Sequence, residues 1–162
     1  MAKAMGATTI FVSDISEYRL ELAQKAGADY LLNPGQMDVV QKVKDATGGL
    51  GAGVVFETSG NVKATKQAFE LLRKNGSMVM IGLPSEPLVL DAGSDIVCKC
   101  ATIYGSYGRD NFISWEIAKN LLASGRVEID SLITHRYKFS EFKEAFEIAE
   151  AGKAGKVLLL PE

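Results

Sequence analysis

The chain has 162 residues, and its 18 basic and 20 acidic side chains give a formal net charge of −2 at neutral pH. This balance excludes a nucleic-acid interface built on bulk positive charge. Hydrophobic residues make up 47% of the chain and charged residues 23%, which is typical of one ordinary globular domain and excludes disordered and collagen-like chains. No apolar run approaches the roughly 20 residues of a membrane helix, and no secretory signal opens the sequence. We therefore expect a cytoplasmic protein with no membrane or nucleic-acid partner.

Histidine and cysteine are too scarce for most metal and nucleophile chemistry. His135 is the single histidine, and Cys98 and Cys100 are the only cysteines. Two thiols and one distant imidazole supply at most three ligands, so we predict no metal ligands in this chain. Neither a Gly-x-Ser-x-Gly elbow nor a Gly-x-x-x-x-Gly-Lys phosphate loop occurs, so we also predict no catalytic residues. We expect the cysteines to be thiols packed beside a strand, and His135 to be a surface or hydrogen-bonded side chain in an irregular stretch.

Short β-branched or apolar runs alternate with amphipathic stretches over much of the chain. Between the runs, apolar residues recur at helical spacing, and Asn75-Gly76 is expected to end the third helix. Such alternation is typical of βαβ units, so the sequence predicts an α/β fold with a doubly wound, mainly parallel sheet. The predicted strands begin near Thr9, Asp29, Gly53, Ser77 and Ala101.

The pattern changes after Arg109, where a longer helix is predicted over Asn111–Ala123. A last helix and a final strand, Lys156–Leu160, follow the stretch that carries His135. No linker rich in proline or serine interrupts the chain, so we interpret this helix and strand as an appended C-terminal segment. The apolar stripe of the last helix consists of Phe142, Ala145, Phe146 and Ala149.

Asp14 and Arg19 are the first candidates for ligand binding. The apolar run from Thr9 to Val12 predicts a buried strand that ends at Asp14. Ligands of open parallel sheets bind at the carboxyl ends of the strands, where a carboxylate accepts hydrogen bonds from a nucleotide ribose and repels a 2′-phosphate. The guanidinium of Arg19 would then stack on the adenine. The alternative is that Asp14 or Ser16 only caps the following helix and that Arg19 is a solvated surface charge.

Three glycine-rich segments are candidate ligand loops. Residues 48–53 follow a helix and precede a strand, the reverse of the order that a phosphate-binding fingerprint needs, so we interpret them as a connecting loop. Ile81-Gly82-Leu83-Pro84 and Gly105-Ser106-Tyr107-Gly108-Arg109 each close a strand instead. Glycines there let a flat ring approach backbone groups that bind a carboxamide. Ordinary tight turns are the alternative at both positions.

Several motifs occur in collinear order through nearly all of the chain. They are Ser13-Asp14, Glu17–Ala23, Gly27–Asp29, Glu57–Gly60, Ile81–Pro84, Tyr107–Arg109 and Ile133–Arg136. Together they resemble the C-terminal, cofactor-binding half of the zinc-dependent medium-chain dehydrogenases, and within that family the threonine and polyol branches most.

This resemblance implies a Rossmann-like, NAD-dependent oxidoreductase that oxidises a secondary alcohol, usually as a cytoplasmic oligomer. It implies that Asp14 binds the adenine ribose and that Arg19 lies against the adenine. In the family a catalytic zinc polarises the alcohol before hydride moves to the nicotinamide. The nicotinamide end would be lined, largely through backbone groups, by Ile81, Gly82, Leu83, Ser106 and Tyr107.

Two parts of the family pattern have no counterpart in this sequence. The zinc ligands and the proton relay belong to an N-terminal catalytic domain. The first Rossmann strand, with its Gly-x-Gly-x-x-Gly turn, precedes the segment that Met1–Gly6 resembles. In the doubly wound order that strand lies between those at Thr9 and Gly53, and without it both neighbours have unpaired backbone groups. We expect either a re-paired sheet or a strand supplied by a partner chain or a swapped segment.

The leading prediction is a truncated cofactor domain of a threonine-dehydrogenase-like enzyme. Residues 1–133 are predicted to be a partial dinucleotide-binding domain, and residues 134–162 a segment that in the family returns to the catalytic domain. We expect a weak or incomplete NAD site, no dehydrogenase activity from the chain alone, and either a homo-oligomer or a complementing N-terminal chain. Two alternatives stay open: one subunit of a split dehydrogenase, and a non-catalytic remnant or interaction module that binds no nucleotide.

Overall fold

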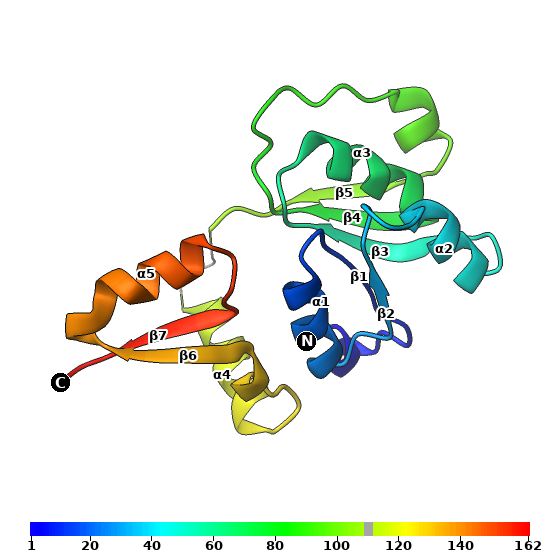
Figure 1. Ribbon diagram of the computed structural model, residues 1–162. Coiled ribbons are helices and arrows are strands. Elements are labelled where there is room, and N and C mark those ends of the chain that lie inside the picture. The colour runs from blue at the N-terminus through cyan, green and yellow to red at the C-terminus, as the bar shows by residue number, and fades with distance from the viewer. Residues whose placement is uncertain (109–111) are drawn as a thin grey trace. The chain divides into compact units, whose positions relative to one another are not determined.

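The computed structural model describes residues 1–108 and 112–162, which form two compact units (Figure 1). The first unit joins Met1–Met37 to Phe112–Glu162, and the second unit spans Asp38–Asn111. Arg109 and Asn111, which belong to the predicted motif and helix above, lie outside the described residues.

The second unit is built on a three-stranded parallel sheet in the order β3-β4-β5. Because its neighbours are parallel, each connection crosses from one end of the sheet to the other. Pairing of Glu57 with Met80, and of Met80 with Gly105, brings the carboxyl ends of the strands to one edge. The elements are α2 (Val39–Ala46), β3 (Ala52–Glu57), α3 (Val62–Leu71), β4 (Leu72–Met80), a π-helical turn (Gly93–Val97) and β5 (Thr102–Gly105).

The core of the second unit lies between α3 and the sheet, where α3 packs on β3 and β4 (Figure 1). Apolar residues at helical spacing place Ala68 and Phe69 on one face of α3, and Phe69 is only 1% exposed. They pack against Leu72 and Met78 of β4. Burial of a Phe or Met side chain stabilises the folded state by about 1.5–3 kcal/mol, so this cluster fixes α3 on the sheet.

The N-terminal part of the first unit is a two-stranded parallel sheet, β1 (Phe11–Ser13) and β2 (Tyr30–Leu32), connected by α1 (Glu17–Lys25). The rings of Phe11 and Tyr30 stack with their centroids 4.6 Å apart. Asp29 precedes β2 and accepts hydrogen bonds from the backbone N–H of Ile10 and from the ammonium of Lys3, which lies in the short helix η1 (Lys3–Met5).

The C-terminal part of the same unit pairs β6 (Ile133–Lys138) with β7 (Lys156–Leu160) in parallel. The helix α5 (Phe142–Glu150) connects these strands and packs on both, and α4 (Ile113–Ala123), η3 (Asp130–Leu132) and η4 (Phe139–Glu141) complete this part. The Arg126 guanidinium donates a hydrogen bond to the carbonyl of Ala4, and Gly155 lies against Leu22 of α1. These contacts join segments that are far apart in the sequence.

The predicted fold class is confirmed. The chain has a Rossmann-like α/β fold in which the strand pairs of the described residues are all parallel, and α5 with β7 forms the appended segment. In the part of the chain that the structure describes, β1 pairs only with β2, and β3 pairs only with β4. Among the described residues, each of these two strands therefore has one open edge. None of the described helices has the length and apolar character needed to cross a bilayer.

The predicted end of the third helix is wrong. Asn75-Gly76 lies within β4, and α3 already ends at Leu71. The reason is that Leu72 turns to an extended backbone and pairs with Ala52 of β3. Sheet pairing therefore stops the helix before the glycine is reached.

The prediction of packed thiols at Cys98 and Cys100 is also wrong, because both side chains are exposed. Lys99, between them, is the part-buried residue instead. Its ammonium donates a hydrogen bond to the carbonyl of Phe69 near the end of α3, and burial lowers the pKa of this ammonium. The segment before β5 is therefore anchored by the lysine, and the two thiols flank it.

Candidate functional site

Asp14 lies directly after the carboxyl end of β1 in the first unit. Its backbone N–H donates to the carbonyl of Leu32 at 3.2 Å, so Asp14 extends the pairing with β2 by one residue. Its Oδ1 accepts a hydrogen bond from the backbone N–H of Ser16 at 2.9 Å. The side chain keeps 25% of its surface accessible. The carboxylate is therefore held in one orientation and still open to a ligand.

Ser16 and Arg19 surround Asp14 at the start of α1. Ser16 is the N-cap of this helix, because its Oγ accepts a hydrogen bond from the backbone N–H of Arg19 at 3.4 Å. The Nη1 atom of Arg19 lies 3.7 Å from Oδ2 of Asp14. Ser16 is thus the capping residue, and Arg19 is an exposed side chain that forms an ion pair with Asp14.

Asn33 supports this loop and was not identified from the sequence. It follows β2 and is 8% exposed. Its Nδ2 donates to the carbonyl of Ile15 at 3.5 Å and to the carboxylate of Glu17, and its Oδ1 accepts from the N–H of Gly35 at 2.9 Å. It therefore ties the loop after β2 to the loop after β1. The signal available in the sequence is an Asn-Pro pair directly after a predicted strand.

Glu57 is the buried polar residue at the carboxyl end of β3 in the second unit, with 4% of its surface exposed. Its carboxylate accepts hydrogen bonds from the N–H of Ser59 at 2.9 Å, from the Ser59 hydroxyl at 2.5 Å and from the N–H of Gly60 at 3.2 Å. Its backbone carbonyl accepts from Ile81 at 2.8 Å and Gly82 at 3.1 Å. From the sequence, Glu57 was only part of a motif, with no role of its own.

The loops after β3 and β4 meet backbone to backbone at Gly60 and Gly82, a contact called here the glycine crossing. A Cβ atom on Gly60 would lie 2.3 Å from the carbonyl oxygen of Leu83. A Cβ atom on Gly82 would lie 2.1 Å from the backbone nitrogen of Gly60. Gly60 also has a φ of +67°, which side chains other than glycine rarely adopt. Both glycines are therefore required by the contact itself, whether or not a ligand binds.

Ser106 and Tyr107 follow β5 at the same edge of the sheet. The backbone N–H of Ser106 donates to the carbonyl of Met80, the last residue of β4, at 2.9 Å. Tyr107 is 86% exposed. The carboxyl ends of β4 and β5 therefore bring together the predicted group Ile81, Gly82, Leu83, Ser106 and Tyr107.

The described residues do not fit a zinc site. Within residues 1–108 and 112–162, no three His, Cys, Asp or Glu side chains come together as metal ligands would. His135 is half-buried, and its Nδ1 lies 2.9 Å from Oγ1 of Thr134. It lies on β6 rather than in the predicted irregular stretch, because this segment, which includes the β-branched Ile133 and Thr134, pairs with β7.

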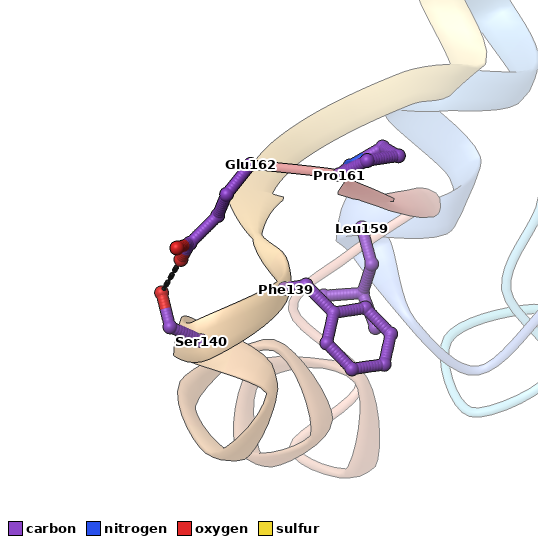
Figure 2. Close-up of a pocket in the computed structure, with 5 residues that line it drawn as sticks. All are labelled: Phe139, Ser140, Leu159, Pro161 and Glu162. Atoms are coloured by element: carbon purple, nitrogen blue, oxygen red, sulfur yellow. Dashed lines mark hydrogen bonds between the residues drawn. The ribbon is translucent and has the colours of Figure 1, made fainter.

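A hollow of about 600 Å³ lies in the first unit beside the end of β7 (Figure 2). The Ser140 hydroxyl donates a hydrogen bond to the carboxylate of Glu162 there. The hollow shares no residue with the loops that carry Asp14, Glu57, Gly82 and Ser106. Its lining consists of Phe139, Ser140, Leu159, Pro161 and Glu162.

Comparison with known proteins decides the family. The family model described as "Zinc-binding dehydrogenase" matches residues 1–124. The chain belongs to this family. It is 42% identical over 161 residues to an L-threonine 3-dehydrogenase of Pyrococcus horikoshii and 37% identical over 161 residues to one of Bacillus licheniformis. Each match covers 99% of this chain and 46% of the relative, so the chain spans about half the length of the curated relatives that it matches.

Solved dehydrogenase structures share the fold of this family member. The alcohol dehydrogenase of Thermotoga maritima matches with a TM-score of 0.88 at 31% identity, covering 99% of this chain and 45% of that one. The 2R,3R-butanediol dehydrogenase of Bacillus subtilis matches with a TM-score of 0.89 at 27% identity, covering 99% and 46%. A short chain alcohol dehydrogenase from Escherichia coli CFT073, solved with cofactor NADH, matches with a TM-score of 0.84 at 25% identity, covering 98% and 46%. The predicted family resemblance is confirmed, and the roles of individual residues stay predictions.

Proposed function

We propose that this chain is the NAD-binding portion of a zinc-type dehydrogenase that oxidises threonine or a related secondary alcohol. The observation that carries the proposal is the Asp14 carboxylate, which follows β1, is oriented by the N–H of Ser16 and is 25% accessible. Open parallel sheets bind nucleotides at this end of their strands. A carboxylate there accepts hydrogen bonds from both hydroxyls of the adenine ribose and disfavours NADP.

Arg19 would hold the adenine. Its side chain is 55% exposed, and its Nη1 is 3.7 Å from Asp14, so the planar guanidinium is available for stacking next to the ribose-binding carboxylate. The identity with L-threonine 3-dehydrogenases, which extends over 99% of the chain, supports the same cofactor chemistry.

The nicotinamide end would bind at the loops after β4 and β5. At the glycine crossing no side chain lies between the two loops, and Ile81 and Leu83 are 43% and 69% exposed. Exposed apolar side chains at the end of a strand suit a flat carboxamide-bearing ring. When bound, NAD accepts a hydride from the alcohol carbon. The residues proposed to line it are Ile81, Gly82, Leu83, Ser106 and Tyr107.

Catalysis would need groups outside residues 1–162. We infer that zinc ligands and a proton relay come from the catalytic domain of the family, to which residues 134–162 would return after a cofactor domain of residues 1–133. The chain alone would bind NAD weakly and form no NADH from threonine. The working enzyme would be a cytoplasmic oligomer.

A second candidate, one subunit of a split dehydrogenase, is favoured by one face of β3. Val54 and Phe56 alternate along this strand and are 55% and 59% exposed. An apolar face next to an open strand edge fits a covering polypeptide better than water. Co-expression with the remaining half of a threonine dehydrogenase tests it. A one-to-one complex that forms NADH would support this candidate, and separate elution of the two chains would exclude it.

Titration of the chain with NAD, followed by calorimetry or NMR, tests the leading proposal. We expect saturable binding by the unaltered chain and about tenfold weaker binding by Asp14→Asn, because the ribose then loses charge-assisted hydrogen bonds. Asp130→Asn changes an exposed carboxylate of η3 in the same unit and is expected to bind like the unaltered chain. Absence of saturable binding by the unaltered chain would overturn the proposal in favour of the interaction module.

A further inference from the structure

Glu57 is buried without a cation beside it. Its side chain is 4% exposed, and the ion pairs found among the described residues do not include it. Its hydrogen-bond donors are the neutral N–H and hydroxyl of Ser59 and the N–H of Gly60. Burial of an ionised carboxylate is costly unless hydrogen bonds compensate it. A serine or asparagine would cap a short turn at lower cost, so the turn alone does not account for a glutamate here.

Glu57 accepts hydrogen bonds from two loops, with its carboxylate from one and with its backbone carbonyl from the other. Its carboxylate binds the loop after β3, through Ser59 and Gly60. Its backbone carbonyl binds the loop after β4, through the N–H groups of Ile81 and Gly82. A Cβ atom on Gly82 would also lie 2.7 Å from Oε2 of Glu57, so the carboxylate packs directly against the glycine crossing.

The consequence is a fixed backbone at the carboxyl edge of β4. Gly60 and Gly82 touch with no space for a side chain, and Glu57 accepts hydrogen bonds from both loops. The exposed side chains of Ile81 and Leu83 emerge from this fixed segment. A flat ligand placed on them would meet a preformed surface, and preformed surfaces bind with less loss of conformational entropy.

We propose that Glu57 is a positioning residue, which holds the backbone of Ile81, Gly82 and Leu83 in the shape that receives the nicotinamide ring. This inference rests on the proposed function. Glu57 acts through the two loops, and its buried carboxylate does not touch the cofactor.

A comparison of NAD with ADP-ribose distinguishes a positioning role of Glu57 from an effect on general stability. ADP-ribose carries the adenosine, the diphosphate and the second ribose of NAD but no nicotinamide ring. A general loss of structure weakens the binding of both NAD and ADP-ribose. A misplaced Ile81–Leu83 segment weakens the binding of NAD alone. The measurement is the ratio of the two dissociation constants for the 162-residue chain.

We expect Glu57→Gln to weaken NAD binding about tenfold and to leave ADP-ribose binding unchanged within about twofold, since one oxygen acceptor is lost under the nicotinamide end only. Glu70→Gln, an exposed glutamate of α3 in the same unit, is the matched control and is expected to change neither constant. Ser59→Ala removes one donor and keeps Glu57, so it provides a milder variant with a smaller shift in the same ratio if Glu57→Gln does not fold.

Hydrogen exchange of the cofactor-free chain provides the second measurement. Glu57→Gln is expected to speed exchange of the amides of Gly60, Ile81 and Gly82 at least tenfold relative to Glu70→Gln. If Glu57→Gln weakens the binding of NAD and of ADP-ribose equally, or weakens neither, the positioning role is overturned while the proposed function stands. If the unaltered chain binds neither NAD nor ADP-ribose, the proposed function fails, and the positioning role is overturned with it.

Discussion

The guanidinium of Arg19 lies next to the carboxylate of Asp14, with Nη1 3.7 Å from Oδ2. The carboxylate therefore partly neutralises the positive charge of the guanidinium, which would otherwise attract an anion. An arginine near this position accommodates the 2′-phosphate of NADP in other Rossmann folds. If NAD binds as proposed, the choice between the two cofactors would depend on both residues.

Asp14→Ala is expected to shift the preference from NAD toward NADP. The change removes the ribose acceptor and leaves Arg19 free for the phosphate, so the ratio of NAD to NADP affinity should fall about tenfold or more. Parallel titrations with the two cofactors measure the ratio. The double variant Asp14→Ala/Arg19→Ala should lose the gain in NADP affinity, and an unchanged ratio in Asp14→Ala would contradict the assignment.

Gly82→Ala is expected to destabilise the second unit by about 3 kcal/mol or more, because the new Cβ would meet backbone atoms that cannot rotate away. Gly105→Ala is the matched control, since a Cβ atom there has no neighbour within 4 Å. Its stability should be unchanged or raised by up to about 1 kcal/mol. Urea unfolding followed by circular dichroism compares them, and equal midpoints for the two variants would show that the crossing is loose.

Phe69→Ala is expected to lower the free energy of unfolding by about 3–5 kcal/mol, because a large core side chain leaves a cavity. Phe56 is the internal control, because it lies on β3 in the same unit but is 59% exposed. Phe56→Ala should change stability by less than about 0.5 kcal/mol. A large loss for Phe56→Ala would indicate that its face is covered, for example by a second copy of the chain.

Asp29 is expected to make stability depend on acid pH. The hydrogen bond from Lys3 and that from the backbone of Ile10 hold the pKa of this carboxyl below its ordinary value of 3.8. A lowered folded-state pKa gives a stabilising contribution that is present above pH 3.8 and is lost as the pH falls through the folded value. Asp29→Asn should lower the melting temperature at neutral pH and flatten its fall at acid pH. Exposed Asp130→Asn should do neither, and identical acid profiles for the two variants would rule out this contribution.

The sequence predicted the order of strands and helices and the place of Asp14, because hydrophobic periodicity and the strand-end rule are local signals. It also marked Gly82 as a strand-end glycine, but not its partner Gly60, since their contact joins two loops through the pairing of β3 with β4. Glu57 was missed for the same reason: its burial follows from that pairing and not from its neighbours in the chain. The helix end at Leu71 and the inward Lys99 depend likewise on tertiary contacts, which override local propensity.

We propose that residues 1–162 bind NAD at the loops after β1 and β4. Hydrogen exchange of the unaltered chain, measured with and without saturating NAD, tests it most directly because each amide reports its own loop. With NAD bound, we expect slower exchange at Ser16, beside Asp14, and at Leu83, beside the glycine crossing. Unchanged exchange at both amides would contradict it.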